Sequence, residues 1–127
     1  MTENDIADRI MDAAFQLHRE LGPGLLESVY EVILSRQLTE MGLAVERQVP
    51  IPVNFRGVAF DEGFRADIFV GQKVIIELKS VERLQPVHSK QLFTYLRLSG
   101  CRLGLLINFG KYLLKDGFKR VVNGLES

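Results

Sequence analysis

The sequence predicts a mixed α/β domain in which one sheet is flanked by helices. Three observations predict this class: two stretches of helical periodicity open the chain, short apolar runs typical of strands fill its middle, and a third helical stretch separates the last two runs. With 127 residues, of which 46% are hydrophobic, the chain can bury one sizeable core. We therefore expect a single domain over residues 1–127.

The first part of the chain is expected to form two helices. Apolar residues recur at helical spacing over residues 4–21, and the Gly-Pro-Gly sequence at 22–24 ends this helix because proline cannot continue it. A second helix is predicted over residues 25–41, with Gly42 as its C-terminal cap.

The middle of the chain is expected to form strands. Residues 43–53 combine β-branched residues with two prolines, which indicates an irregular or edge strand. Residues 64–70 and 73–79 are stronger strand candidates and are joined by a short turn around Gly71 and Gln72.

The last part of the chain returns to a helix and a strand. A third helix is predicted over residues 86–99, with proline in its first turn and Gly100 at its end. Residues 103–109 form a buried strand candidate, whereas the basic tail over residues 111–125 has no clear pattern. The predicted order is therefore α-α-β-β-β-α-β.

Charge is balanced overall but unevenly distributed. Residues 1–46 carry nine acidic and three basic residues, whereas the remainder carries seven acidic and thirteen basic residues. This asymmetry favours a positive face for a polyanion, although a strongly basic nucleic-acid binder would carry more positive charge.

Several classes of protein are not expected. No apolar run reaches the roughly eighteen residues of a membrane span, and the polar, acidic N-terminus is unlike a secretory signal. A single cysteine cannot form an internal disulfide, and with two histidines it cannot build a tetrahedral zinc site. We therefore expect a reduced, cytoplasmic protein that does not enter the membrane.

Strand 73–79 carries two charges on one of its faces. Alternation places Val74, Ile76 and Leu78 on an apolar face, and Ile75, Glu77 and Lys79 on the other. Glu77 and Lys79 would then lie roughly 6.5–7 Å apart along the strand. A solvated ion pair is the simpler interpretation of this motif taken alone.

Asp67, on the preceding strand, changes this interpretation. With a three-residue turn over 71–73, Asp67 lies directly opposite Glu77, with Cβ atoms about 5 Å apart. Two carboxylates at that distance repel each other unless a cation lies between them, and a divalent cation suits such ligands. A two-residue turn would instead place Asp67 opposite Ile76 on the wrong face. The register of these strands therefore decides the hypothesis.

These residues also resemble a known family. Asp67, followed after nine residues by Glu77-Leu78-Lys79, resembles the Asp…(Asp/Glu)-x-Lys core of the PD-(D/E)xK nuclease superfamily, although Ala66 stands where that motif has proline. The Gly-Leu-Leu-Glu-Ser-Val-Tyr segment at 24–30 is similar to the signature of the small bacterial GxxExxY family, and the similarity extends over nearly the whole chain. The resemblance implies a restriction-endonuclease-like core.

The resemblance also implies a role for individual residues. Asp67 and Glu77 would be metal ligands, and Glu27 would be the helical acid that many of these nucleases place beside the metal. Lys79 would position or activate the attacking water and stabilise charge on the phosphate. An alternative explanation for Glu27 is that acids in the first turn of a helix are favoured by the helix dipole.

The predicted third helix carries a further motif. Gln91 and Tyr95 resemble the QxxxY motif of the RecB-like exonuclease branch and, being four residues apart, would share one helix face. Equally, they are compatible with a polar pair at the edge of the core.

The function implied by this set is hydrolysis of DNA or RNA with Mg²⁺ or Mn²⁺. Mg²⁺ retains several waters and needs only one or two protein carboxylates, which fits this sparse set of ligands. Such an ion lowers the pKa of bound water and clamps the phosphate oxygens. Two alternatives stay open: a non-catalytic nucleic-acid-binding module that retains the fold, and a homodimeric interaction protein whose polar cluster is structural.

Overall fold

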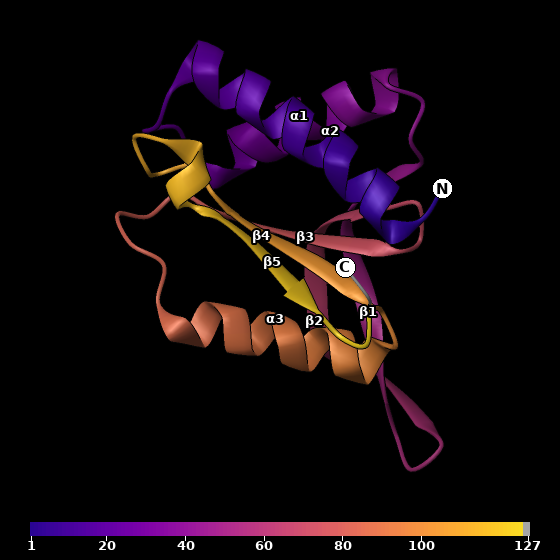
Figure 1. Cartoon of the computed structure of the whole chain (residues 1–127). Coiled ribbons are helices and arrows are strands. Elements are labelled where there is room, and N and C mark those ends of the chain that lie inside the picture. Colours follow the sequence, from indigo (N-terminus) through magenta and orange to yellow (C-terminus); the bar gives the residue numbers. More distant parts are fainter. Residues whose placement is uncertain (126–127) are drawn as a thin grey trace.

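The computed structural model describes residues 1–125 and shows a five-stranded sheet with helices on both faces (Figure 1). The helices are α1 (Glu3–Leu21), α2 (Glu27–Glu40), α3 (Pro86–Ser99) and a short 3₁₀ helix, η1 (Leu114–Asp116). The strands are β1 (Val45–Phe55), β2 (Val58–Val70), β3 (Val74–Lys79), β4 (Leu103–Asn108) and β5 (Phe118–Val122). Helices α1 and α2 cover one face and α3 covers the other, so the predicted mixed α/β class is confirmed.

The strands lie in the order β1-β2-β3-β4-β5. All neighbours are antiparallel except β3 and β4, which are parallel and are connected through α3, as a parallel pair requires a long crossover. Strand β1 is an edge strand, as predicted for residues 43–53. Because parallel strands end at the same side of a sheet, Lys79 and Asn108 are paired neighbours at the ends of β3 and β4.

Local sequence signals predicted the helices closely. Helix α3 spans the predicted residues, with Pro86 at its start and Gly100 in the left-handed conformation at its end, with φ of 81°. Helix α2 begins two residues later than predicted because Leu26 is extended, with ψ of 150°, and forms the N-cap. Met41 is the C-terminal cap, and Gly42 follows it with φ of 88°.

The predicted order α-α-β-β-β-α-β lacks one strand, and one predicted strand is too short. Strand β5 was not expected because it is an edge strand in which two charged residues interrupt the apolar positions. Strand β2 begins at Val58 rather than at residue 64. Its first five residues are exposed, in a hairpin that projects from the body (Figure 1), so no buried face imposes an apolar alternation there.

Two apolar clusters fill the space on either side of the sheet. The larger cluster joins α1 and α2 to the sheet and contains Val74, Ile76 and Leu78, whereas the smaller cluster beneath α3 contains Ile75. The predicted alternation of β3 is therefore confirmed. None of the helices within residues 1–125 is both long and apolar enough to cross a bilayer.

Candidate active site

Asp67 and Glu77, which we call the acid pair, lie where β2 and β3 separate. The two strands pair as Val70–Val74, Phe69–Ile75 and Ile68–Ile76, which confirms the three-residue turn on which the prediction depended. Beyond these pairs, the backbone N–H of Leu78 donates to Asp67 Oδ2 at 2.8 Å. The carboxylate of Asp67 thus takes the place of a backbone carbonyl as the acceptor for β3, and it lies beside that strand.

Asp67 lies where the regular alternation of side chains between the two faces of the sheet is interrupted in the β1–β2 hairpin. On β2, Ile68 belongs to the cluster under α1 and α2, whereas Ala66 belongs to the cluster under α3, although regular alternation would keep both on one face. On β1 the change occurs at Gln48, which has a positive φ of 52°. A positive φ is uncommon for a residue other than glycine and is a form of strain that often occurs at functional sites.

Burial raises the pKa of both members of the acid pair. For Glu77, burial and then the charge of Asp67 raise the pKa to about 8, against the smaller lowering effect of Lys79. Burial likewise raises the pKa of Asp67, and the charges of Glu31 and Glu27 act in the same direction. The hydrogen bond from Leu78 and the charge of Lys79 lower it. The acid pair is therefore a site where negative charge is destabilised.

The chemistry of the acid pair fits a divalent cation. Glu77 Oε1 is buried and has no hydrogen-bond partner within the part of the chain that the structure describes. A buried charged oxygen without a partner is costly, and a bound cation would satisfy it. Among residues 1–125 no three His, Cys, Asp or Glu side chains converge closely enough to hold a metal. The donor set is thus sparse, which suits an ion that retains several waters.

Lys79 lies at the end of β3 on the same face as Glu77. Its side chain is half-buried, and its charge lowers the pKa of both acids. No hydrogen bond of its ammonium group occurs among the described residues. A flexible amine next to two carboxylates can donate to a water or to a phosphate oxygen.

Glu27 is close enough to act on the acid pair electrostatically but does not join it in a compact cluster. It is the first residue of α2, its side chain is exposed, and its charge raises the pKa of both Asp67 and Glu77. The turn before it is fastened to the end of β3, because Ser80 Oγ donates to Leu25 O at 2.8 Å.

Tyr30 holds the same turn from within the core. Its hydroxyl donates to Gly22 O at 2.6 Å and accepts from the N–H of Leu25 at 3.2 Å. Its fully buried ring stacks on Phe109, with centroids 4.3 Å apart. Tyr30 therefore supports the segment that presents Glu27 and does not contact the acid pair itself.

The sequence prediction missed a polar network behind Asp67. Glu31, which is buried on α2, accepts from Arg47 at 2.9 and 3.1 Å and from Gln48 Nε2 at 2.6 Å. The same Gln48 nitrogen lies 3.5 Å from Asp67 Oδ1. The one available signal was that Glu31 follows Glu27 by four residues and shares its side of the helix.

The QxxxY residues lie on α3, and among residues 1–125 no hydrogen bond, ion pair or ring contact joins them to the acid pair. Tyr95 stacks on Phe64 of β2, with ring centroids 3.9 Å apart and planes 7° apart. The side chain of Gln91 is exposed. Tyr95 thus anchors α3 against the strand that carries Asp67, three residues beyond Phe64.

Comparison with known proteins agrees with this arrangement. A search of curated proteins found no match. The model of the PD-(D/E)XK nuclease superfamily matches residues 4–121, a stretch that includes all five strands apart from the last residue of β5. With a match over most of its length and a mixed sheet that carries the acid pair and Lys79, the chain belongs to the PD-(D/E)XK nuclease superfamily.

Proposed function

We propose that residues 1–127 act as one divalent-metal-dependent nuclease domain that hydrolyses phosphodiester bonds in DNA or RNA. The observation that carries this proposal is the buried acid pair, with Lys79 beside it and with a Glu77 oxygen that has no hydrogen-bond partner among the described residues. Nucleases of this superfamily typically use divalent metal ions. The segment at 24–30 supports membership of the GxxExxY family. A nucleic-acid substrate also fits the cytoplasmic location expected from the sequence.

In this proposal each polar group has a distinct task. Asp67 and Glu77 would hold Mg²⁺ or Mn²⁺, and Glu27, at the start of α2, would orient a water molecule beside them. When bound, the ion supplies a water of lowered pKa and a positive clamp on the phosphate. Lys79 orients the attacking water and donates to the phosphate oxygen on which negative charge develops.

The remaining residues position these groups or the substrate. Glu31 and Gln48 hold Asp67 in place from behind, as outer partners of metal ligands do. Tyr95 positions α3 through its stack on Phe64. Gln91, one helical turn before Tyr95, has an exposed side chain that can contact substrate.

The test is cleavage of labelled single- and double-stranded DNA and RNA with Mg²⁺ or Mn²⁺. Asp67→Asn and Glu77→Gln preserve shape and remove charge, and each is expected to lower the cleavage rate by about 100-fold or more, since even outer partners of metal ligands contribute 10–100-fold. Glu82→Gln, an exposed position in the loop after β3, serves as the matched control. Activity that survives both site substitutions would contradict the assignment.

One observation favours the alternative of a non-catalytic nucleic-acid-binding module. The acids described in the structure do not gather in a group of three, and Glu27 remains exposed. This alternative predicts salt-dependent binding of nucleic acid without metal-dependent turnover. Binding by the wild-type protein, combined with the absence of cleavage at millimolar Mn²⁺, would favour it over the nuclease.

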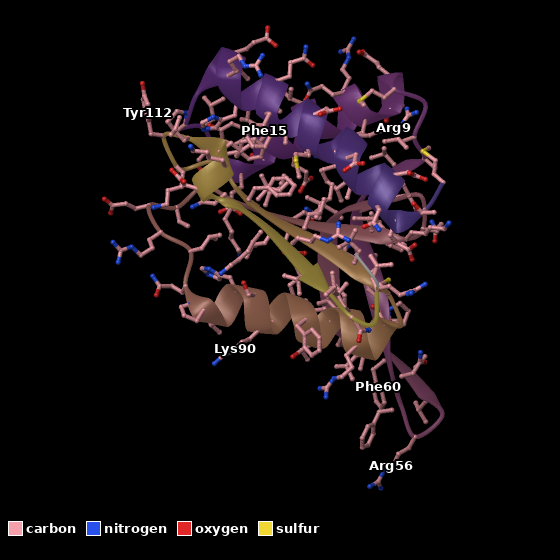
Figure 2. All side chains as sticks on the ribbon, in the orientation of Figure 1. Arg9, Phe15, Arg56, Phe60, Lys90 and Tyr112 are labelled. Carbon is pink, nitrogen blue, oxygen red and sulfur yellow. The ribbon has the colours of Figure 1, made fainter. Side chains whose placement is uncertain are left out.

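The homodimeric alternative is favoured by the projecting β1–β2 hairpin. Phe55, Val58 and Phe60 of this hairpin are 58%, 53% and 45% exposed, and Figure 2 shows Arg56 at its tip and Phe60 nearer to the body of the protein. Exposed apolar side chains of this kind are typical of interfaces. Sedimentation velocity of wild type and Phe60→Ser tests this alternative, which requires a dimer that the substitution weakens.

A further inference from the structure

A basic groove runs between α3 and β5, at the opposite edge of the sheet from β1. Its volume is about 600 Å³, and four cationic residues line it: Lys90 and Arg97 of α3, and Lys119 and Arg120 of β5. No acidic residue lines it within the part of the chain that the structure describes. The guanidinium of Arg120 is already engaged, because it donates to the side chain of Asn4. The groove therefore attracts a polyanion.

An exposed aromatic ring lies among these cations. Phe93 lines the same groove, is 42% exposed, and stands three residues after Lys90 and four before Arg97. These spacings place the three side chains on one side of α3. Figure 2 shows Lys90 extending from α3 toward solvent. Cations combined with an aromatic stacking surface are the features with which proteins bind single-stranded nucleic acid, because every base offers a face for stacking.

A second basic hollow adjoins the groove. This hollow of about 230 Å³ shares Lys119 with the groove and adds Arg83 and Lys111, with Asp116 as its one acidic lining residue. Arg83 belongs to the loop that follows Lys79 at the end of β3. That loop is held against the end of β4, because Asn108 Oδ1 accepts from the N–H of Val81 at 3.0 Å and its Nδ2 donates to Val81 O at 2.9 Å.

We propose that the α3–β5 groove binds single-stranded nucleic acid, with a base stacked on Phe93 and phosphates held by Lys90, Arg97 and Lys119, and that the strand continues past Arg83 and Lys111 to the acid pair. The inference rests on the proposed function and sharpens it, because it names a single strand as the substrate class. Sequence readout is not part of it, since stacking and phosphate contacts accept any base.

The test is fluorescence anisotropy in EDTA with three labelled probes of equal length: oligo(dT), oligo(U) and a blunt DNA duplex. Omitting the divalent ion separates binding from cleavage. Lys90→Ala/Arg97→Ala/Lys119→Ala is expected to weaken oligo(dT) binding roughly 10–100-fold and to reduce the slope of log affinity against log salt by about 2. Arg9→Ala/Arg19→Ala/Arg36→Ala removes the same charge from exposed positions on α1 and α2 and is expected to bind as wild type.

Phe93 provides the second arm of the experiment. Phe93→Leu keeps apolar bulk but removes the aromatic face, so a loss of roughly 5-fold or more is expected for both single strands, with Phe93→Tyr restoring binding. Equal binding by the groove triple variant and wild type would overturn the inference, as would a preference for the duplex. Salt-insensitive binding that Phe93→Leu leaves intact would also overturn it, because neither phosphate contacts nor stacking on Phe93 would then account for the binding.

The two proposals fail in distinguishable ways. If the groove variants lose binding while wild type never cleaves with Mg²⁺ or Mn²⁺, the groove stands and the nuclease proposal fails. If wild type cleaves and the groove variants bind and cleave equally well, the nuclease stands and the groove inference fails.

Discussion

The acid pair at the end of β3 and the α3–β5 groove are both charged, but they are built in opposite ways. Asp67 and Glu77 are partly buried and repel each other, and Glu77 Oε1 has no hydrogen-bond partner among residues 1–125. The cations of the groove are exposed, and no acid from the described part of the chain lines the groove with them. Exposed like charges cost little because water screens them, whereas buried ones destabilise the fold. This difference supports our proposals that the acid pair binds a cation and that the groove binds a polyanion.

The largest expected effect separates chemistry from binding. Lys79→Met keeps the length of the side chain and removes its charge and proton, so we expect cleavage to fall by about 10²–10⁴-fold, the usual contribution of a group that moves a proton. Binding of oligo(dT) in EDTA should remain within about 2-fold of wild type, since the groove supplies the phosphate contacts. Lys73→Met, an exposed position just before β3, is the control. Equal losses of cleavage and binding would mean that Lys79 belongs to the binding surface.

A smaller effect is expected for the network behind Asp67. Gln48→Ala removes the amide that lies 2.6 Å from Glu31 and 3.5 Å from Asp67. Loss of such an outer partner typically lowers metal affinity 10–100-fold, so Mn²⁺ affinity, measured by calorimetry, should fall within that range. Gln72→Ala, at another position with a positive φ, controls for the effect of alanine on a strained backbone conformation. Unchanged Mn²⁺ affinity would show that Gln48 is a structural residue only.

The buried acids should also make the metal-free protein less stable as the pH rises. Because the folded protein keeps the proton on Glu77 up to a pKa of about 8, against 4.5 ordinarily, the unfolded chain binds fewer protons between these values. Stability should therefore fall through this interval, by an amount on the order of a few kcal/mol.

Urea unfolding in EDTA at pH 5 and pH 8.5 measures this effect. In the Glu77→Gln variant the side chain at position 77 cannot titrate. The free energy of unfolding of this variant, relative to that of wild type, should therefore increase from pH 5 to pH 8.5. Replacing the EDTA with Mn²⁺ at pH 8.5 should stabilise wild type and leave the variant unchanged. Parallel pH dependence in the two proteins would show that Glu77 ionises freely in the folded state.

The smallest effect is expected at the turn that presents Glu27. Tyr30→Phe removes a hydroxyl with two hydrogen bonds, to Gly22 O and from the N–H of Leu25, and should lower the free energy of unfolding by about 1–2 kcal/mol. Tyr112→Phe, at a position that is 85% exposed, should change it by less than about 0.5 kcal/mol. Equal stability of the two variants would mean that the turn does not depend on Tyr30.

Short-range patterns predicted much of the fold. Helix α3 matched its predicted bounds because Pro86 and Gly100 act locally at the helix ends. The register of β2 and β3 followed from a three-residue turn and from apolar alternation, and it brought Asp67 beside β3 as expected. Strand β5 escaped prediction because it is an edge strand whose apolar pattern is broken by two charged residues.

The polar network behind the site was not predictable in the same way. Glu31 and Gln48 are 17 residues apart in the sequence and lie on different elements, so only the fold brings them together. The face change at Gln48 depends on a backbone conformation that no local signal favours in glutamine. For Glu27 the family motif predicted a place beside the metal ligands, but it did not predict that the side chain would be exposed.

A crystal structure of the wild-type protein soaked in Mn²⁺, with anomalous data, tests directly whether the acid pair binds a divalent cation. We expect an anomalous peak within about 2.0–2.3 Å of carboxylate oxygens of both Asp67 and Glu77, with waters as the other ligands, and we expect the peak to be lost in Glu77→Gln. A well-ordered acid pair with no peak at millimolar Mn²⁺, or a peak elsewhere that the substitution leaves in place, would contradict the proposed metal site.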